Sequence, residues 1–470
     1  MRKTKIICTI GPACSDEKTL SKLCLAGMNV ARLNFSHGTH EQHLEVIKRI
    51  KKVREELDLP IAIMLDTKGP EYRIGTFENG SVCIENGAEF TFTTRDIVGN
   101  EECVSVSYKG IASEMKKGDI IKVNDGLLIF EVTQTTETDV ICKTLVGGEL
   151  RDRKSMSFPD KVLKQQYVSE ADKSDILFGI ENDVDFFACS FVSCKQDLLD
   201  VKKILAQNGG EKIDIIAKIE NRSGVLNIAE ICEECDGIMV ARGDLGVEIP
   251  FEELPAIQKK LIRECRLLGK RVITATEMLE SMIHNVRPTR AEISDVANAV
   301  FDGTSAVMLS GETAAGKNPV LTLETMSKIV EHAESSISYD KRFKNTEFKI
   351  KNTVDAISHA TCSMALDIDA KVIAVCSLSG QTARMVSRFR PIADILGLTT
   401  DEKTWRKLSL SWGVQPAKCE LFNSTDVLFY TAKNLAVSKF SLKKDDGIVI
   451  TGGMTNGSSG NTNMIKVEIV

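Results

Sequence analysis

The stretch IDIIAKIE, residues 213–220, is an almost continuous apolar run that carries a lysine and a glutamate near its end. Strands buried on both faces of a parallel sheet have this composition, whereas half-exposed strands alternate apolar and polar residues. We therefore predict a fully buried parallel strand here. Seven other runs have the same character: TKIICTI (4–10), NVARLNF (29–35), IAIMLD (61–66), DFFACSFV (185–192), DGIMVARG (236–243), RVITAT (271–276) and SAVMLS (305–310).

Each of the eight runs is followed by a segment with helical periodicity, such as residues 41–56 and 251–268. Eight strand and helix units in succession are the pattern of a closed (β/α)8 barrel, in which helices surround a parallel sheet that closes on itself. The sequence thus predicts an α/β fold with a TIM barrel as its central domain, formed by residues 1–69 and 168–337.

The spacing between the runs is regular except between the third and the fourth, where residues 70–167 intervene. This insertion contains short strand-like pieces bounded by Asn-Gly, Gly-Asp and Gly-Gly, a pattern that is typical of antiparallel strands. We predict an antiparallel β-barrel domain over these residues and call it the lid. Its pieces are SVCIEN (81–86), EFTFTT (89–94), DIIKVNDGLLIFEV (119–132) and TDVICKTL (138–145).

A third unit follows the barrel. Apolar runs at 370–377, 393–400 and 446–453 are as strong as those of the barrel and alternate with helical segments. Alternating strands and helices favour an open parallel sheet covered by helices. We predict an open-sheet α/β domain over residues 338–470, with a regulatory role.

The charge of the chain bears on its partners and its location. The formal net charge is −6, and the sequence has no block of lysines and arginines. Both features argue against a nucleic acid or an anionic membrane as the main partner. No apolar run reaches the length of a membrane span, and the apolar part of the opening MRKTKIICTIGP is too short for a signal peptide. We expect a cytoplasmic protein.

The cysteines favour a reducing environment. Most of the fourteen lie singly in apolar runs, as Cys8, Cys189 and Cys376 do, which is typical of buried thiols rather than of a disulfide framework. Cys232 and Cys235 form a single C-x-x-C. Because neither a second pair nor a histidine cluster accompanies them, a zinc or redox role is disfavoured.

The stretch SGETAAGKNP, residues 310–319, has the G-x-x-x-x-G-K spacing of a phosphate-binding P-loop. A P-loop needs a serine or threonine after the lysine to bind Mg²⁺, and this chain has Asn318 there. Pro319 follows, and a residue before proline avoids helical geometry, so we expect no helix to open at this point. The sequence therefore argues against a P-loop.

Polar residues follow the predicted barrel strands at their carboxyl ends, where barrel enzymes place their catalytic groups. Because these ends share one rim, we expect the side chains to lie near one another. They are Arg32, Asn34, Ser36, Asp66, Thr67, Lys218, Glu220, Asp244, Thr276, Ser310 and Glu312.

Lys218 interrupts a buried run, and a buried ammonium is costly unless an anion meets it. A structural ion pair with Glu220 or Asp244 is one interpretation, and an anionic substrate is the other. The two carboxylates come from adjacent strand ends, where a hard divalent cation fits between them. Arg32 and Arg73 add cations suited to a transferred phosphoryl group.

With these residues in place, the sequence resembles the pyruvate kinase family. The resemblance spans nearly the whole chain, and its segments occur in the order of the family. They are ARLNFSHG (31–38), LDTKGPEYRIG (65–75), AKIEN (217–221), ARGDLGVEIP (241–250), ATEMLESM (275–282), RPTRAE (287–292), DGTSAVMLSGETAAGKNP (302–319), SGQTAR (379–384) and GNTNMIKV (460–467).

The resemblance implies transfer of the phosphoryl group of phosphoenolpyruvate to ADP, which gives ATP and pyruvate. Lys218 would balance charge on the transferred group and on the enolate oxygen. Either Thr276 or a water near Ser310 and Glu312 would protonate the enolate. The other implied roles are Mg²⁺ or Mn²⁺ on Glu220 and Asp244, the substrate carboxylate on Gly243, Asp244 and Thr276, phosphate oxygens on Arg32 and Arg73, and the nucleotide on Asn34, His37, Arg73 and Lys154.

The resemblance also implies a K⁺ site with oxygen ligands only, which suit a hard cation. Its ligands would be Asn34, Ser36, Asp66 and Thr67. Members of the family that need K⁺ carry glutamate in the segment T-K-G-P-E, and this chain has Glu71. We therefore predict K⁺ dependence, with a solvated loop charge as the plainer interpretation of Glu71.

Some segments depart from the family. Tyr72 and Ile74 stand where isoleucine and threonine are usual, and residues 157–172 lack the customary Leu-Pro-Gly and the second Leu-Pro. These departures affect the expected closing of the lid and the expected reach of Lys154. The chain resembles the compact form, without an N-terminal extension or an additional C-terminal domain, and the family implies a homotetramer.

In the C-terminal domain, SLSGQTAR (377–384) resembles a loop that holds the phosphate of an activator. Hydroxyls of Ser377, Ser379 and Thr382, with Gly380 allowing backbone N–H groups to converge, suit an anion. Trp412 and GGMTNGSSGN (452–461) would supply a neighbouring loop. A sugar phosphate or a nucleoside monophosphate fits, and a helix cap without a ligand is the alternative.

Three other classes of protein share part of this pattern. A P-loop ATPase fails at Asn318. A barrel lyase acting on a keto acid would share Mg²⁺, lysine and arginine but needs neither a K⁺ site nor a lid that closes on a nucleotide. A binding protein that has lost catalysis would lack one of Lys218, Glu220, Asp244 or Thr276, and all four are present.

Overall fold

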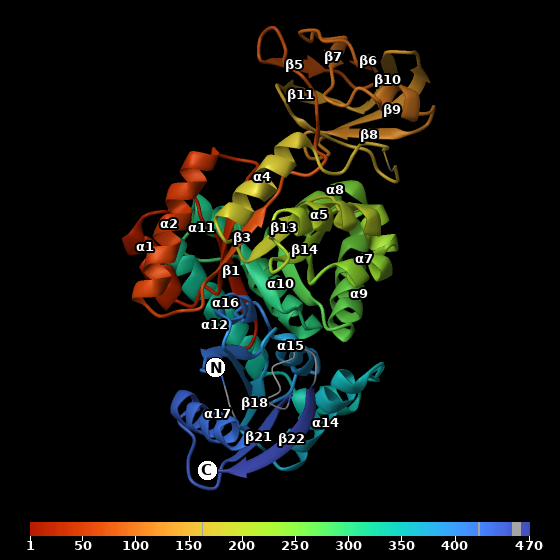
Figure 1. Ribbon diagram of the computed structural model, residues 1–470. Coiled ribbons are helices and arrows are strands. Elements are labelled where there is room, and N and C mark those ends of the chain that lie inside the picture. Colours follow the sequence, from red (N-terminus) through yellow and green to blue (C-terminus); the bar gives the residue numbers. More distant parts are fainter. Residues whose placement is uncertain (162, 422–423, 454–461) are drawn as a thin grey trace.

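The computed structural model describes residues 1–161, 163–421, 424–453 and 462–470. Three bodies are arranged in space along the long axis of the molecule: a lid, a central barrel and a C-terminal domain (Figure 1). The lid stands above one end of the barrel, and the C-terminal domain packs against the other end (Figure 1). The N-terminus lies near the junction of the barrel and the C-terminal domain, and the C-terminus lies at the far end of that domain (Figure 1). The boundaries after residues 69, 167 and 337 stay predictions.

The eight predicted strands close into one parallel barrel, so the fold class is confirmed. Apolar residues from alternate positions, among them Ile7, Met64, Phe186 and Met308, fill its interior and are at most 1% exposed. The barrel is thus a packed core rather than a pore. In barrel order the strands are β1 (Lys5–Thr9), β17 (Ala306–Leu309), β16 (Arg271–Ala275), β15 (Gly237–Ala241), β14 (Asp214–Ile219), β13 (Phe186–Cys189), β3 (Ala62–Asp66) and β2 (Val30–Asn34).

Helices cover the outside of the barrel. Their caps explain where they begin: Thr39 and Gln42 form a capping box at the start of α2, and Thr289 and Glu292 form another at α10, which pairs backbone donors that would otherwise lack a partner. The helices are α1 (Glu17–Leu25), α2 (His40–Glu56), α4 (Glu170–Glu181), α5 (Lys195–Gln207), α6 (Arg222–Leu226), α7 (Ile228–Glu234), α8 (Arg242–Glu248), α9 (Leu254–Leu267), α10 (Arg290–Asp302), α11 (Gly311–Ala314) and α12 (Pro319–Ser335), with short 3₁₀ turns at Phe251–Glu253 and Glu280–Ile283.

One expectation was wrong. Helix α12 opens directly at Pro319, after Asn318 in a non-helical conformation. The residue before proline does avoid helical geometry, but proline itself suits the first helical position because its missing N–H would be unpaired there. The P-loop remains excluded, since Asn318 supplies no hydroxyl.

The lid is a sheet of seven strands, mostly antiparallel, with a small two-stranded sheet beside it. Backbone bonds from Gly75 N–H to Ser105 O (2.7 Å) and from Ser107 N–H to Arg73 O (2.9 Å) join the two edges of the large sheet and close it. The strands are β4 (Tyr72–Arg73), β12 (Ser155–Ser157), β8 (Ile120–Val123), β9 (Leu128–Thr135), β10 (Asp139–Val146), β6 (Glu89–Thr93) and β7 (Cys103–Ser105), with β5 (Ser81–Ile84) and β11 (Gly148–Arg151) in the small sheet and one short helix, α3 (Ile111–Glu114).

The C-terminal domain is an open sheet with helices on both faces, as predicted, and its last strand runs antiparallel. Its strands in order are β20 (Val414–Lys418), β19 (Asp394–Thr399), β18 (Val372–Cys376), β21 (Gly447–Gly453) and β22 (Thr462–Ile469). Its helices are α14 (Thr353–Asp367), α15 (Gln381–Arg388), α16 (Glu402–Leu408) and α17 (Thr425–Phe440), and α13 (Tyr339–Lys344) connects it to the barrel.

Largely buried ion pairs join this domain to the amino ends of the barrel strands. Arg406 Nε donates to Asp185 Oδ1 at 2.8 Å, and Lys407 Nζ donates to Asp214 Oδ1 at 2.7 Å. Asp214 begins the strand that ends near Lys218. The opposite rim therefore stays open toward the lid.

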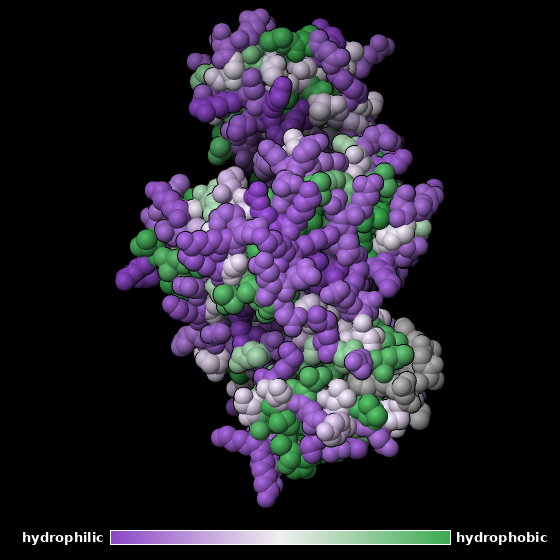
Figure 2. Space-filling view, turned by 60° about the vertical axis from the view of Figure 1, so that its left-hand side comes forward, coloured by the Kyte–Doolittle hydropathy of each residue, from purple (hydrophilic) through white to green (hydrophobic). Residues whose placement is uncertain are grey.

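Hydrophilic residues cover most of the barrel on the face shown in Figure 2, and apolar residues gather over the C-terminal domain. Among the described residues no helix is long and apolar enough to cross a membrane. All fourteen cysteines are free.

The phenylalanine core of the lid gives a stability prediction. Phe90, Phe92 and Phe130 are fully buried, with ring centroids of each pair 5.1–5.6 Å apart. Replacing Phe130 with alanine should lower the free energy of unfolding of the lid by about 3–5 kcal/mol because it leaves a cavity. Denaturant unfolding measures this. Leu127→Ala, at a side chain that is 67% exposed, is the matched control, and an equal loss in both variants would contradict the packing described here.

Candidate active site

A buried ammonium lies at the centre of the upper rim of the barrel. Lys218, near the end of β14, is 8% exposed. Its Nζ lies 3.1 Å from Asp66 Oδ1 and 2.9 Å from Glu220 Oε1, and it donates to Ser190 Oγ at 2.7 Å. Both carboxylates come from strand ends, so the barrel itself brings these charges together. The structural ion pair that was one interpretation of the sequence is thus present. Lys218 pairs with Asp66 as well as with Glu220.

The burial of these groups shifts their titration. Burial alone would lower the pKa of Lys218, but the Asp66 and Glu220 carboxylates outweigh it and raise that pKa above its ordinary value. Burial also opposes ionisation of Asp66, yet Arg32 and Lys218 hold its pKa below the usual range. For Glu220, which is fully buried, burial raises the pKa to about 8 despite Lys218, and Asp244 adds to the rise. At neutral pH, Lys218 is charged and Asp66 is ionised.

Arg32 extends this cluster toward β1. Its Nε donates to Asp66 Oδ2 at 2.7 Å, and its Nη1 donates to Thr9 Oγ1 at 2.9 Å. Only 8% of the residue is exposed. One carboxylate, Asp66, therefore holds both Arg32 and Lys218, which leaves their remaining N–H groups for an anion at the rim.

A second group of residues lies where β15 and β16 end. Gly243 N–H donates to Thr276 Oγ1 at 2.8 Å, and Asp244 follows on the exposed side of α8. Thr276 has a left-handed backbone, with φ of 67°, which is rare for a β-branched residue and marks a position fixed by its surroundings. The structure thus brings together Gly243, Asp244 and Thr276, as predicted.

Arg242 explains how Thr276 is held, a role that was not predicted. Its guanidinium donates to the carbonyl oxygens of Ala275 and Thr276 and to Asp295 Oδ2 at 2.5 Å. Ser190 was missed as well, although it contacts Lys218. Both residues act through backbone carbonyls or tertiary contacts, for which a single sequence carries no signal.

The predicted K⁺ ligands come from neighbouring strands. Asn34 and Asp66 are paired across β2 and β3. Thr67 directly follows Asp66, and Ser36 lies two residues after Asn34. Asn34 Oδ1 accepts from Ser36 N–H at 3.2 Å. Asp66 and Thr67 are buried, whereas Ser36 is exposed. The four residues therefore form one oxygen-rich corner of the rim.

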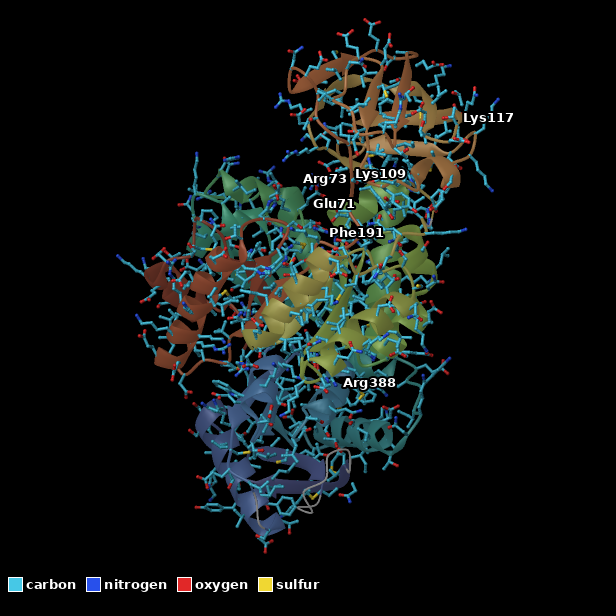
Figure 3. The ribbon with its side chains drawn as sticks, turned by 45° about the horizontal axis from the view of Figure 1, so that its top comes forward. Glu71, Arg73, Lys109, Lys117, Phe191 and Arg388 are labelled. Atoms are coloured by element: carbon cyan, nitrogen blue, oxygen red, sulfur yellow. The ribbon has the colours of Figure 1, made fainter. Side chains whose placement is uncertain are left out.

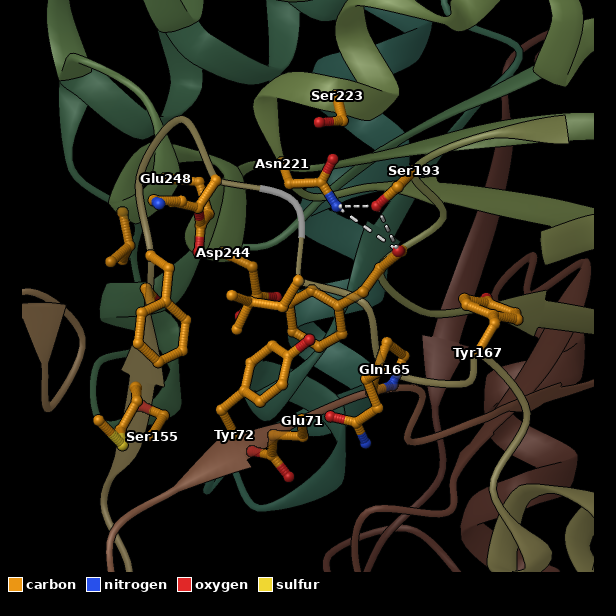
Figure 4. Close-up of a pocket in the computed structure, with 18 of the residues that line it drawn as sticks. Glu71, Tyr72, Ser155, Gln165, Tyr167, Ser193, Asn221, Ser223, Asp244 and Glu248 are labelled. Carbon is orange, nitrogen blue, oxygen red and sulfur yellow. Dashed lines mark hydrogen bonds between the residues drawn. The ribbon is translucent and has the colours of Figure 1, made fainter. Parts of the chain in front are cut away.

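The lid residues face the barrel across a cleft of about 380 Å³. Glu71, Arg73, Lys154 and Asp244 line it, and Figure 4 shows Glu71 and Asp244 among the lining residues. Arg73 is paired with Glu71 and donates to Arg153 O at 2.7 Å, and the pair lies at the base of the lid near Phe191 (Figure 3). His37 is exposed and does not line this cleft. The cleft thus unites the lid cations with one of the two predicted metal-binding carboxylates.

The predicted effector loop has a defined shape. Gly380 has a left-handed backbone, with φ of 74°, directly before α15. Ser379 is exposed and Ser377 half-buried, while the Thr382 hydroxyl is buried against Thr462 Oγ1 at 2.6 Å. Thr382 thus faces Thr462.

The expectation for Trp412 was wrong. Trp412 is buried, and the Arg390 guanidinium lies over its ring at 4.6 Å. It precedes the amino end of β20, whereas the loop at Ser377 follows the carboxyl end of the parallel strand β18. Trp412 therefore lies at the amino ends of the parallel strands, and the loop at Ser377 lies at their carboxyl ends. Residues 454–461 of the second predicted loop lie outside the described residues.

The two thiols of the C-x-x-C segment lie close to a third cysteine. Cys232 and Cys235 are buried, and Cys232 Sγ lies 3.3 Å from Cys265 Sγ. The hydrogen bond with Cys235 lowers the pKa of Cys232, but the hydrogen bond with Cys265 and burial outweigh it and raise that pKa above its ordinary value. In the part of the chain that the structure describes, no group of three histidine, cysteine or acidic side chains is arranged to hold a metal ion.

A closed parallel barrel with lysine, arginine and carboxylate groups at the carboxyl rim, covered by a lid, defines an enzyme that acts on a small anionic substrate. Comparison with known proteins makes the class specific. The family model described as "Pyruvate kinase, barrel domain" matches residues 1–323, and "Pyruvate kinase, alpha/beta domain" matches residues 355–468. The chain belongs to the pyruvate kinase family, which makes it a phosphotransferase.

Individual relatives agree along the whole chain. A pyruvate kinase of Clostridium acetobutylicum is 45% identical over 472 aligned positions and covers both chains completely. One from Staphylococcus aureus is also 45% identical, and the match covers 100% of this chain and 81% of the relative. A crystal structure of a pyruvate kinase from Cryptosporidium parvum superposes with a TM-score of 0.95 at 37% identity, covering 100% of this chain and 96% of that one.

The titration of Glu220 gives a pH prediction. Its pKa rises from an ordinary 4.5 to about 8, so between these values the folded protein binds more protons at Glu220 than the unfolded protein does. Stability from this group is therefore present at pH 5 and is lost as the pH rises toward 8. In metal-free buffer, the free energy of unfolding of Glu220→Gln should fall less between pH 5 and pH 8 than that of the wild type. Parallel pH curves for the two proteins would contradict the assignment.

Proposed function

We propose that the chain transfers the phosphoryl group of phosphoenolpyruvate to ADP, giving ATP and pyruvate. The observation that carries this proposal is the buried Lys218 ammonium between Asp66 and Glu220, with Arg32 on the same carboxylate. Such a fixed cluster of cations suits a reaction in which charge develops on a phosphoryl group and on an enolate oxygen.

The proposed reaction breaks one bond and forms others, and the residues of the barrel and of the lid would have different roles in it. A β-phosphate oxygen of ADP attacks phosphorus, the bond from phosphorus to the enol oxygen breaks, and the enolate takes up a proton at its terminal carbon. Lys218 and Arg32 would face the transferred group from the barrel, while Arg73, Lys154, Asn34 and His37 would bind the nucleotide. Gly243, Asp244 and Thr276 would hold the substrate carboxylate at the start of α8.

The carboxylates support a divalent cation. Glu220 and Asp244 repel each other enough to help raise the pKa of Glu220, and a Mg²⁺ or Mn²⁺ ion between them would relieve this repulsion. Such an ion supplies positive charge to substrate oxygens when bound. Two protein carboxylates with substrate oxygens and water are a donor set that suits Mg²⁺. The residues of this chain therefore fit the ion.

Regulation, assembly and location are carried over from the family resemblance. We propose that a phosphorylated activator binds at Ser377, Ser379, Gly380 and Thr382, where a left-handed glycine precedes α15. We also propose a homotetramer and a cytoplasmic location. A metal-dependent lyase acting on a keto acid is the second candidate, favoured only by the rim residues that both reactions share.

Formation of pyruvate from phosphoenolpyruvate and ADP tests the function. Lys218→Met should lower kcat by about a thousandfold, because it removes a preorganised charge from the transition state. Lys317→Met, in the stretch that resembles a P-loop, changes an exposed lysine and should leave kcat within about twofold, since changes at such surface positions are usually mild. A coupled assay of pyruvate measures both. Cleavage of a keto acid without ADP would favour the lyase, and equal losses in the two variants would refute the role of Lys218.

The K⁺ site gives a separate prediction. Wild-type activity should collapse when K⁺ is replaced by a large organic cation, whereas Glu71→Lys should retain activity without K⁺ because its ammonium supplies the missing charge. Glu78→Lys makes the same charge change at an exposed lid residue and should stay K⁺-dependent. If wild-type activity does not depend on K⁺, the proposed reaction still stands, but the predicted K⁺ site is contradicted.

A further inference from the structure

The lid is joined to the barrel by two crossings of the chain. The first runs from Asp66 to Tyr72 and the second from Ser157 to Ser169, so any movement of the lid turns about these segments. Gly69 N–H on the first crossing donates to Asp172 Oδ1 at 3.0 Å. After Pro159 the second crossing contains no further proline, so other contacts must fix the place of its later part.

Tyr167 supplies such a contact. It lies on the second crossing, is 9% exposed and packs within the main core of the barrel. Its hydroxyl donates to Ser190 O at 2.7 Å. Figure 4 shows Tyr167 on the wall of the cleft. Burial raises the pKa of Tyr167 above its ordinary value, so the hydroxyl keeps its proton and acts as a donor.

The carbonyl that Tyr167 contacts belongs to an unusual turn. Phe191, the next residue, has a left-handed backbone with φ of 55°, which is unfavourable for a bulky side chain unless neighbouring contacts hold it. The N–H of this same peptide unit, that of Phe191, donates to Glu220 Oε2 at 2.6 Å. One peptide group is therefore held by Tyr167 at its oxygen and by Glu220 at its nitrogen.

Ser190 also links this turn to the first crossing and to the central lysine. Its hydroxyl donates to Thr67 O at 2.7 Å and accepts from Lys218 Nζ at 2.7 Å. Gly69 passes so close that an added Cβ would lie 2.7 Å from Ser190 O. Both crossings thus meet at Ser190, which contacts the ammonium at the centre of the site.

We propose that Tyr167 is a positioning residue: through the peptide between Ser190 and Phe191 it connects the hinge of the lid to Glu220 and Lys218. The inference deepens the proposed function and rests on it only for its effect on turnover. Without the hydroxyl, the peptide can rotate toward an ordinary backbone conformation and withdraw its N–H from Glu220. The ring of tyrosine without its hydroxyl still fills the core.

The test compares Tyr167→Phe with Tyr108→Phe. The second variant removes a tyrosine hydroxyl that donates to Glu114 of the lid, and Glu114 in turn accepts from Lys164 N–H on the second crossing. This control therefore changes a contact of the hinge that does not involve the peptide between Ser190 and Phe191. In Tyr167→Phe, kcat should fall about tenfold while KM for phosphoenolpyruvate changes less than threefold, as expected for a group that acts on the transition state. Tyr108→Phe should keep kcat within twofold of the wild type.

A measurement without turnover accompanies the kinetics. Hydrogen exchange followed by mass spectrometry should show the peptide covering residues 186–193 exchanging at least fivefold faster in Tyr167→Phe, and unchanged in Tyr108→Phe. Unchanged exchange there overturns the inference, whether or not kcat falls, and so does an unchanged kcat in an active enzyme. If the wild type makes no pyruvate, the proposed function fails, and the exchange data still decide whether Tyr167 holds the turn.

Discussion

The ammonium of Lys218 and the carboxylates around it are the constraint on which the rest of the site depends. A charge buried to this degree is stable in a folded protein only when opposite charges and hydrogen bonds surround it. Asp66, Glu220 and Ser190 provide them, each from a different strand end of the barrel. The catalytic interpretation and the structural one therefore describe the same contacts, because the fold holds the lysine in place before any substrate binds.

The three bodies of the molecule have separate relations to this cluster. The C-terminal domain pairs with the amino ends of the strands, through contacts such as Lys407 with Asp214, and so leaves the carboxyl rim free. The lid contributes Arg73 and Lys154 across a cleft. Only the two crossings connect lid and barrel along the chain, and both reach Ser190. The hinge and the chemistry consequently share one residue.

Much of this could be predicted from the sequence, for physical reasons. Continuous apolar runs identify the barrel strands, and charged residues at their ends, such as Lys218 and Arg32, stand out because burial makes them costly. The contacts of Arg242, Ser190 and Tyr167 could not be found in this way, since each residue acts by meeting a backbone carbonyl or a side chain distant in sequence. The start of α12 at Pro319 and the place of Trp412 were mispredicted because local rules were applied without the tertiary arrangement.

The most direct test of the central claim is a crystal structure with Mn²⁺ and oxalate, a planar dianion that resembles the enolate of pyruvate. The anomalous signal of manganese locates the metal independently of the protein coordinates. The account predicts the ion between Glu220 and Asp244, with an oxalate oxygen within hydrogen-bonding distance of Lys218 Nζ. Manganese bound away from these carboxylates, or oxalate out of reach of Lys218, would contradict it.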